Sequence, residues 1–319
     1  MYEKILVGYD DSGSSRDALA LAEALARASD GGVVIANVYE RYRYEIPQPG
    51  YASWEQFLRE EAENLVRGAL NRVRKEGSVP SEHLKSMVIG NSVRGASSPA
   101  RGLHELAEEL EADLIIVGAS NRSRIGQALV GSTAQRLLHG SHCPVCVAPA
   151  GYAKSKRTAT HLVAVGYDGS PEAMLALDLA WRTAAAGGGR VRVLSVAKPP
   201  SARHGKGPGA GQGYQELEAA IEETIQQELD EAVGKLPDNL ETEAVRLHGD
   251  PATELCEAAA DADLLFMGSR GYGPFSRVLM GSVSSAVVEA SVCPVVITPR
   301  GVEADADAEP ALAASGHES

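Results

Sequence analysis

The sequence predicts an α/β protein made of two similar domains in tandem, each with a five-stranded parallel sheet flanked by helices. Three observations lead to this prediction: the chain repeats itself after about 150 residues, strand and helix signals alternate within each copy, and the strand segments are apolar throughout. Strands that are apolar on both faces and separated by helices are typical of a parallel sheet buried between helical layers. A repeat of this length is a domain rather than a solenoid unit.

Short matching segments define the repeat. Residues 7–10, Val-Gly-Tyr-Asp, recur as residues 165–168, and the stretch 112–118, which runs from Ala-Asp to Gly, recurs as 262–268. Thirteen residues after the glycine that ends each stretch comes a Gly-Ser pair. The predicted organisation is a first domain at residues 1–150, a short polar linker, a second domain at residues 160–300, and an acidic, disordered tail at residues 301–319.

Local signals predict the elements of the first domain in order. Each strand is an apolar run, and the first helix begins at an N-cap provided by Ser14 or Ser15 and extends to Ser29. The second domain repeats this order, with a glycine-rich insertion at residues 205–213 before its long helix. Right-handed crossovers are expected in both domains. The strands are predicted at residues 4–9, 33–38, 84–89, 114–117 and 144–148, and the later helices at residues 54–76, after Pro99 and from Gly131.

Composition narrows the class of protein. The formal net charge is -13, so the phosphate backbone of a nucleic acid should repel the chain, although a small nucleotide responds to its local site. No apolar run approaches the roughly 20 residues that a membrane helix needs. The N-terminus lacks the pattern of a secretory signal. A cytoplasmic protein without nucleic-acid or membrane partners is expected.

The cysteines leave two interpretations open. Cys143 and Cys146 form a C-x-x-C motif with His139 and His142 just upstream, so a metal site is conceivable. The favoured interpretation is a buried strand with its entry turn. The equivalent stretch that begins at Cys293 keeps one cysteine and has no histidine nearby, so no metal site is predicted.

Ligands of open parallel sheets bind beyond the carboxyl ends of the strands, where the strand order reverses. Two unusual segments of the second copy fall there: Asp168, after the first strand, and the loop after the fourth strand. This loop contains Gly268 and Gly271, then nine residues, then Gly281-Ser282. The first two glycines permit positive φ and close approach to a ligand. The last pair begins a helix, whose unpaired N–H groups favour an anion.

This G-x2-G-x9-G-S spacing resembles that of the universal stress protein family in its ATP-binding branch, and the resemblance extends through both copies. It implies Rossmann-like domains of the adenine nucleotide alpha hydrolase-like type that bind ATP, with Mg²⁺. It also implies that Asp168 contacts the ribose or adenine end and that Val196 lines the adenine pocket, with Asp10 and Val38 as counterparts. The alternatives are helix N-capping by the aspartates and core packing of the valines.

The first copy departs from this pattern at one position. Its loop starts at Gly118 and continues to Gly131-Ser132-Thr133, but Asn121 replaces the second glycine. Asparagine tolerates positive φ better than other side chains, yet its Cβ costs about 1–2 kcal/mol, roughly a tenfold or greater loss of affinity. Arg122 and Arg124 could compensate by meeting phosphate charge. The first site is therefore expected to bind more weakly.

Strong catalysis is not expected. Neither a Walker motif, a G-x-G-x-x-G at the first strand–helix turn nor a G-x-S-x-G elbow is present. Asp10 and Asp168 are the main groups available for phosphoryl transfer. The predicted function is an ATP-binding stress-response sensor or regulator with at most slow hydrolysis. The alternatives are an ATP-using transferase or ligase of similar architecture, and an interaction module whose glycine loops bind no nucleotide.

The final strand of each copy, at residues 144–148 and 294–298, lies by resemblance at the edge of its sheet. An apolar edge strand exposes unpaired backbone groups and invites pairing. The two copies are therefore expected to pair with each other inside one chain as a pseudo-two-fold dimer, and a homodimer of chains is a further expectation.

Overall fold

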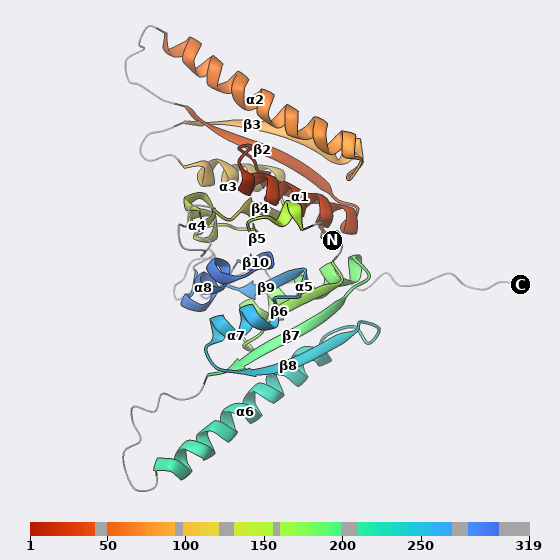
Figure 1. Cartoon of the computed structure of the whole chain (residues 1–319), viewed down its shortest axis with the longest axis vertical. Coiled ribbons are helices and arrows are strands. Elements are labelled where there is room, and N and C mark those ends of the chain that lie inside the picture. The colour runs from red at the N-terminus through yellow and green to blue at the C-terminus, as the bar shows by residue number, and fades with distance from the viewer. Residues whose placement is uncertain are drawn as a thin grey trace, which may run out of the picture.

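The computed structural model describes residues 1–41, 50–92, 98–120, 131–155, 160–198, 210–269 and 280–299. Predictions about Asn121, Arg122, Arg124, Gly271 and the tail at residues 301–319 lie outside the described residues. In the described part, the predicted alternation of strands and helices is present in both halves (Figure 1).

Each half contributes five strands. The strands are β1 (Lys4–Gly8), β2 (Gly32–Arg41), β3 (Leu84–Ser92), β4 (Leu114–Gly118), β5 (Val145–Ala148), β6 (Leu162–Gly166), β7 (Arg190–Ala197), β8 (Thr242–His248), β9 (Leu264–Gly268) and β10 (Val295–Thr298). The helices are α1 (Gly13–Ser29), α2 (Tyr51–Glu76), α3 (Pro99–Leu110), α4 (Ser132–Leu138), α5 (Pro171–Ala186), α6 (Ala210–Gly234), α7 (Pro251–Ala258) and α8 (Ser282–Ala290), with the 3-10 helices η1 (Ser81–His83) and η2 (Tyr152–Lys154).

In the described part of the chain, the ten strands form one continuous sheet with the order β3-β2-β1-β4-β5-β10-β9-β6-β7-β8. Within each half the strands are parallel, whereas β5 and β10 pair antiparallel, with Val296 opposite Cys146. This is the internal pairing that the edge-strand argument predicts. It leaves α2 and α6 at opposite ends of the molecule (Figure 1).

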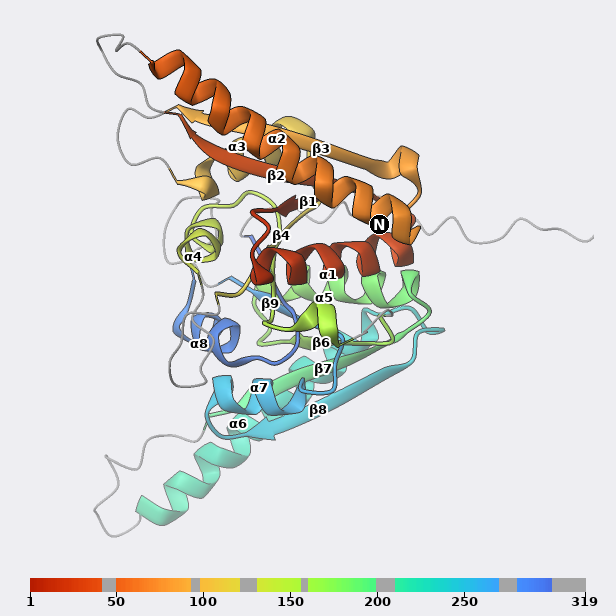
Figure 2. The same ribbon diagram turned by 45° about the horizontal axis from the view of Figure 1, so that its top comes forward.

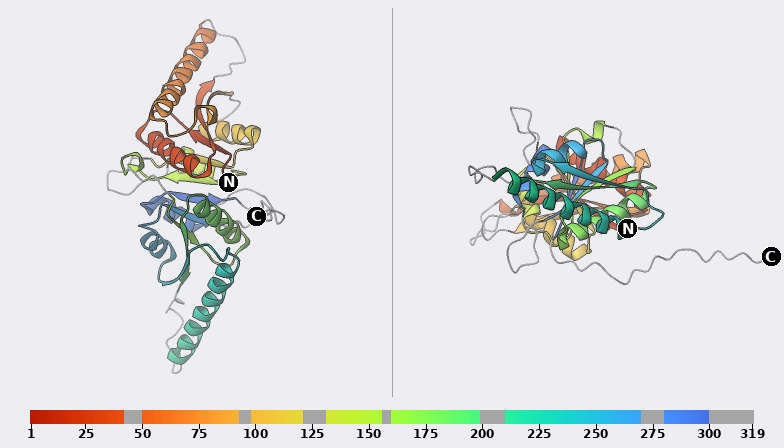
Figure 3. Two further views of the ribbon diagram at one scale, coloured as in Figure 1. Left: turned by 90° about the vertical axis from the view of Figure 1, so that its right-hand side faces the viewer. Right: turned by 90° about the horizontal axis from the view of Figure 1, so that it is seen from below.

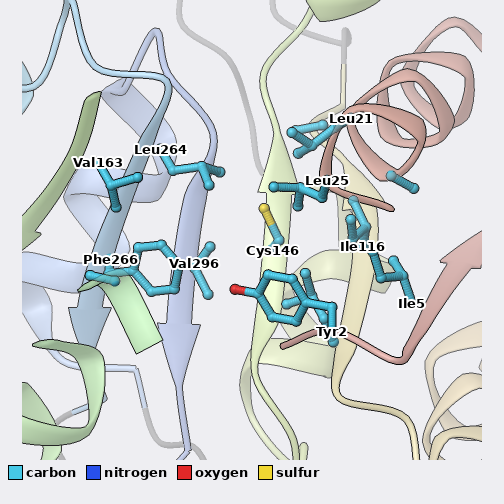
Figure 4. Close-up of a cluster of buried hydrophobic side chains, with 14 of the residues drawn as sticks. Tyr2, Ile5, Leu21, Leu25, Ile116, Cys146, Val163, Leu264, Phe266 and Val296 are labelled. Carbon is cyan, nitrogen blue, oxygen red and sulfur yellow. The ribbon is translucent and has the colours of Figure 1, made fainter. Parts of the chain in front are cut away.

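Two layers of helices cover the sheet (Figure 3). One hydrophobic cluster combines α1, α2, α5 and α6 with alternate strand residues such as Ile5 and Val7. The other combines α3, α4, α7 and α8 with the residues between them, such as Leu6. The first cluster crosses the seam between the halves, where Tyr2 and Cys146 lie near Val296 (Figure 4). The two halves therefore share one core on each face of the sheet.

Two local predictions were wrong. The N-cap of α1 is Ser12 rather than Ser14 or Ser15, because its hydroxyl accepts a hydrogen bond from the backbone N–H of Ser15 at 3.2 Å. The segment after β5 is also more than a polar spacer. Tyr152 is buried, and the carboxylate of Asp17 on α1 accepts hydrogen bonds from the backbone N–H groups of Gly151 (2.7 Å) and Ala153 (2.9 Å).

The C-x-x-C motif folds as the favoured interpretation expects. Cys146 is fully buried within β5, and Cys143 lies in the entry turn, where burial raises the pKa of its thiol to about 11. His142 Nε2 lies 3.0 Å from the carboxylate of Glu108 instead of joining the cysteines. None of the helices in the described part of the chain combines the length and the apolar composition that a bilayer crossing requires.

Candidate functional site

Each half has a cavity at the carboxyl ends of its strands. The first cavity lies beside β1, which pairs with β2 and β4, and the second beside β6, which pairs with β7 and β9. The first cavity, of about 640 Å³, lies at the ends of β1, β2 and β4, and the second, of about 330 Å³, lies at the ends of β6, β7 and β9. Both volumes fall within the range of small-molecule sites. The sequence-predicted residues in their walls are Asp10, Val38, Gly118, Gly131, Ser132 and Thr133 in the first, and Asp168, Val196, Gly268, Gly281 and Ser282 in the second.

The two aspartates hold the turns at the entrance to the helices. Asp10 accepts hydrogen bonds from the hydroxyl (2.5 Å) and backbone N–H (3.1 Å) of Ser12, and Asp168 is bonded in the same way by Ser170 (2.5 and 3.3 Å). Since Ser12 and Ser170 are the N-caps, the capping alternative for the aspartates is wrong. Burial alone would raise the pKa of Asp10, but the hydrogen bonds from Ser12 and Ser15 outweigh it and lower the pKa.

The valines satisfy both interpretations that the sequence left open. Val38 and Val196 are half-buried, pack against the hydrophobic cluster that contains α3 and α7, and also line the cavities. They therefore present an apolar wall that belongs to the core on its inner side.

Gly118 and Gly268 are needed for a reason other than the predicted one. Neither has positive φ. Instead, a Cβ on Gly118 would lie 1.9 Å from the backbone oxygen of Ser14, and one on Gly268 would lie 2.6 Å from the carbonyl carbon of Glu172. The start of α1 or α5 passes directly over the glycine, so these residues permit close packing within the chain rather than an unusual turn.

Among the described residues, no side chain caps the helix starts at the cavities. Gly131 precedes α4 and Gly281 precedes α8, both in extended conformation and without a side chain that could accept from the first N–H groups. Ser282 is exposed at the start of α8 and lines the second cavity. Unpaired N–H groups and the helix dipole make such an end favourable for an anion.

Sequence reasoning missed Ser269, which follows Gly268. The residue is 0% exposed, lines the second cavity, and its Oγ has no hydrogen-bond partner among the described residues. Buried hydroxyls are normally paired. The first half has Ala119 at this position. Ser269 belongs to the loop that contains Gly268 and Gly271. Only its burial distinguishes it from a solvated loop residue, and the sequence does not reveal that burial.

Comparison with known proteins identifies the fold. The model of the Universal stress protein family matches residues 1–149 and again residues 160–299. The chain belongs to the universal stress protein family. A universal stress protein of Mycobacterium tuberculosis is 27% identical over 305 residues, which cover 92% of this chain and 99% of that protein. One of Mycolicibacterium smegmatis is 28% identical over 302 residues, which cover 93% and 97%.

A solved structure agrees with this assignment. The crystal structure of a universal stress protein from Archaeoglobus fulgidus aligns with a TM-score of 0.66 at 20% identity and covers 93% of this chain and 98% of that chain. The likeness concerns the fold, which in this chain is that of two tandem Rossmann-like domains.

The two universal stress protein domains differ in the charges beside their cavities. In the first, Asp11 has a φ of 60°, and its carboxylate accepts hydrogen bonds from the hydroxyl of Tyr9 (2.7 Å) and the guanidinium of Arg16 (3.0 Å). In the second, Gly169 occupies the matching turn position, and the carboxylate of Glu228 from α6 packs over it and lines the cavity.

The carboxylate of Glu228 is poorly stabilised. Burial, and then the neighbouring charges of Asp168 and Glu231, raise its pKa. Lys198 also lines this cavity and adds a positive charge. Neither Glu228 nor Lys198 stands out in the sequence, because each belongs to a segment that matches no motif.

Proposed function

We propose that this universal stress protein binds ATP in its second domain and acts as a nucleotide-dependent stress sensor or regulator. The triphosphate lies at the start of α8, and the nucleoside lies toward the ends of β6 and β7. A weaker site of the same kind lies in the first domain.

The buried hydroxyl of Ser269 is the observation that carries this proposal. A hydroxyl without a partner costs about 1–3 kcal/mol in a buried site. Ser269 lines the same cavity as Gly281 and Ser282, at the uncapped start of α8. A phosphate oxygen in this place would accept hydrogen bonds from the hydroxyl and from the backbone N–H groups at once. The residues present therefore fit a phosphate group.

The remaining walls suit the nucleoside. Val196 offers an apolar surface for the base, and the carboxylate of Asp168 can accept hydrogen bonds from ribose hydroxyl or base N–H groups. Each hydrogen bond from an N–H to a charged phosphate oxygen contributes about 1.5–3 kcal/mol. Three or four such bonds support micromolar affinity, near -8 kcal/mol, after the cost of association. Mg²⁺ would come with the phosphates, since it binds through few protein ligands.

Binding with at most slow hydrolysis suits the role of a regulator. The carboxylate of Asp168 already accepts two hydrogen bonds from Ser170, and this engagement supports a positioning role over that of a base. Phosphoryl transfer needs a group that orients the nucleophile as well as the metal. The protein is therefore proposed to report the nucleotide rather than to consume it.

Calorimetry with ATP and Mg²⁺ on the full-length chain and on Ser282→Glu tests the proposal. A carboxylate in the first turn of a helix favours the helix itself but repels a phosphate at the same place. We expect the variant to keep its melting temperature and to lose at least a hundredfold in affinity at the second site, about 2.7 kcal/mol. Ser285→Glu, one turn further along α8, is the matched control and should bind ATP normally.

Mass spectrometry of nucleotide released from freshly purified protein gives an independent check. Recovery of an adenine nucleotide is expected. Wild-type affinity in Ser282→Glu, or no ATP binding at any site, would contradict the proposal.

A further inference from the structure

A third cavity, of about 380 Å³, lies on the seam between the two domains, away from both nucleotide cavities. The first domain contributes Tyr2, Ala112 and Pro144 to its wall, and α5 of the second domain contributes Leu179 and Arg182. Cavities at domain interfaces, with mostly apolar walls and few polar groups, are typical places for small ligands. This volume lies within the range of such sites.

The matching place in the other half of the molecule is filled by the chain itself. Alignment of the N-caps Ser12 and Ser170 sets Leu175, Leu179 and Arg182 of α5 opposite Asp17, Leu21 and Ala24 of α1. All three α1 residues are buried. Tyr152 of η2 is buried in the hydrophobic cluster that contains Leu21. The carboxylate of Asp17 accepts hydrogen bonds from the backbone N–H groups of the residues on either side of Tyr152.

On α5 the same face stays open. Leu175, Leu179 and Arg182 are all partly exposed, although α5 and α1 lie side by side near the centre of the molecule (Figure 2). Leu175 replaces the carboxylate of Asp17, so this face lacks the acceptor that holds η2 on α1. The face of α5 that corresponds to the docking site of η2 on α1 therefore borders a cavity that is available to a ligand.

The polar groups of the cavity indicate which ligand it would take. The carboxylate of Asp113 already accepts the backbone N–H groups of Glu3 (2.7 Å) and Lys4 (2.8 Å), and His142 faces Glu108. The guanidinium of Arg182 donates from Nε to Asp178 at 2.9 Å and lies over the ring of Trp181, 5.0 Å from its centroid. Its terminal nitrogens have no hydrogen-bond partner among the described residues. Two parallel N–H donors of arginine match the two oxygens of a carboxylate.

We propose that this cavity binds a small aromatic carboxylate, with its ring between α5 and Tyr2 and its carboxylate on the terminal nitrogens of Arg182. Because both domains form the wall, the ligand also stabilises their association. The binding is non-covalent: burial holds Cys143, the thiol in the wall, in its protonated form.

Titration of the full-length protein with benzoate and with benzyl alcohol, followed by ligand-observed NMR, tests the proposal. The two probes share the ring and differ in charge. We expect wild type to bind benzoate at least tenfold more tightly than benzyl alcohol, and Arg182→Gln to abolish that difference. Leu179→Trp fills the cavity and should remove the binding of both probes. Arg190→Gln, at an exposed ion pair with Glu241, is the matched control and should leave both unchanged.

Several results would overturn the proposal. These are equal affinity for the two probes, benzoate binding that survives Arg182→Gln, or no binding up to about 10 mM, the weak end for a ligand of this size. ATP binding should be unaffected in all three variants, so this test is independent of the proposed function. If Leu179→Trp fails to fold, the comparison between Arg182→Gln and Arg190→Gln still decides.

Discussion

The two cavities at the strand ends, one in each half, have the same scaffold and different contents. In both, the carboxylate of an aspartate accepts a hydrogen bond from the N-cap serine of the following helix. In both, a glycine at the end of the fourth strand allows the start of that helix to pack closely against it. The first cavity is the larger but has Ala119 where the second has Ser269. Beside the second cavity, burial and neighbouring negative charges raise the pKa of Glu228. Beside the first, the carboxylate of Asp11 forms an ion pair with Arg16.

This comparison separates the parts of the fold that serve architecture from those that serve a ligand. What the two halves share is explained by packing: strand ends, N-caps and close backbone approach. What differs is the set of polar groups that face the cavity. Cavity size alone would favour the first site, whereas the chemistry of phosphate recognition favours the second.

The largest expected effect concerns the glycines on which the shared scaffold depends. Gly118→Ala should destabilise the fold by about 3 kcal/mol or more, at the top of the range for overpacking. Gly268→Ala should cost less, because its Cβ would meet backbone at 2.6 Å rather than 1.9 Å. Chemical denaturation of both variants measures the difference. Gly68→Ala in α2, where a Cβ meets nothing within 4 Å, should instead stabilise by about 0.5–1 kcal/mol. An equal loss of unfolding free energy in Gly118→Ala and Gly268→Ala would contradict the comparison.

Ser269→Ala should reveal the unpaired hydroxyl through opposite effects with and without ligand. Without ATP the variant should melt at the same or a higher temperature, because a buried unpaired polar group is removed. With ATP it should lose about tenfold in affinity at the second site, since a hydrogen bond to a charged oxygen is lost. Ala119→Ser is the reciprocal change in the first half. Calorimetry and melting curves measure both, and loss of stability without ATP would count against our assignment.

Asn121→Gly tests whether the departure from the family spacing weakens the first site. Calorimetry of the unmodified protein should give two classes of site or fewer than two nucleotides per chain. On the sequence-based expectation that residue 121 takes positive φ, the variant should bind up to about tenfold more tightly at the first site, because glycine carries no Cβ there. Two identical tight sites in the unmodified protein would show that Asn121 has no such cost.

Glu228→Gln should have the smallest effect, and a pH-dependent one. The pKa of Glu228 is raised in the folded state, so its ionisation destabilises the fold. The stability that the protonated side chain contributes is fully present below the pKa of the unfolded chain, about 4.3, and is lost as pH rises through the pKa of the folded state. The variant should remove this loss and be slightly more stable than wild type at neutral pH. Removal of a negative charge should also improve ATP binding by about twofold at low salt. Melting curves from pH 4 to pH 8 measure the effect, with Asp11→Asn as the control that should lose stability instead.

The sequence by itself predicted the repeat, the strands of both halves and the strand ends at which the cavities lie. Apolar runs and matched segments such as residues 7–10 and 165–168 depend on local patterning, which needs no knowledge of the fold. Alternating strands and helices imply a parallel sheet, and the carboxyl ends of its strands then locate the cavities. For the same reason, residues at strand ends, such as Asp168 and Gly268, could be identified in advance.

Only the tertiary structure decided what these residues do. The requirement for Gly268 arises from a backbone segment of α5 far away in the sequence. Ser269 is distinctive only because it is buried and its hydroxyl has no hydrogen-bond partner in the described part of the chain. Glu228 reaches the second cavity from α6, and Tyr152 docks on α1 while the matching face of α5 stays open. Each of these depends on atoms brought together from distant parts of the chain, and local sequence patterns contain no record of such distances.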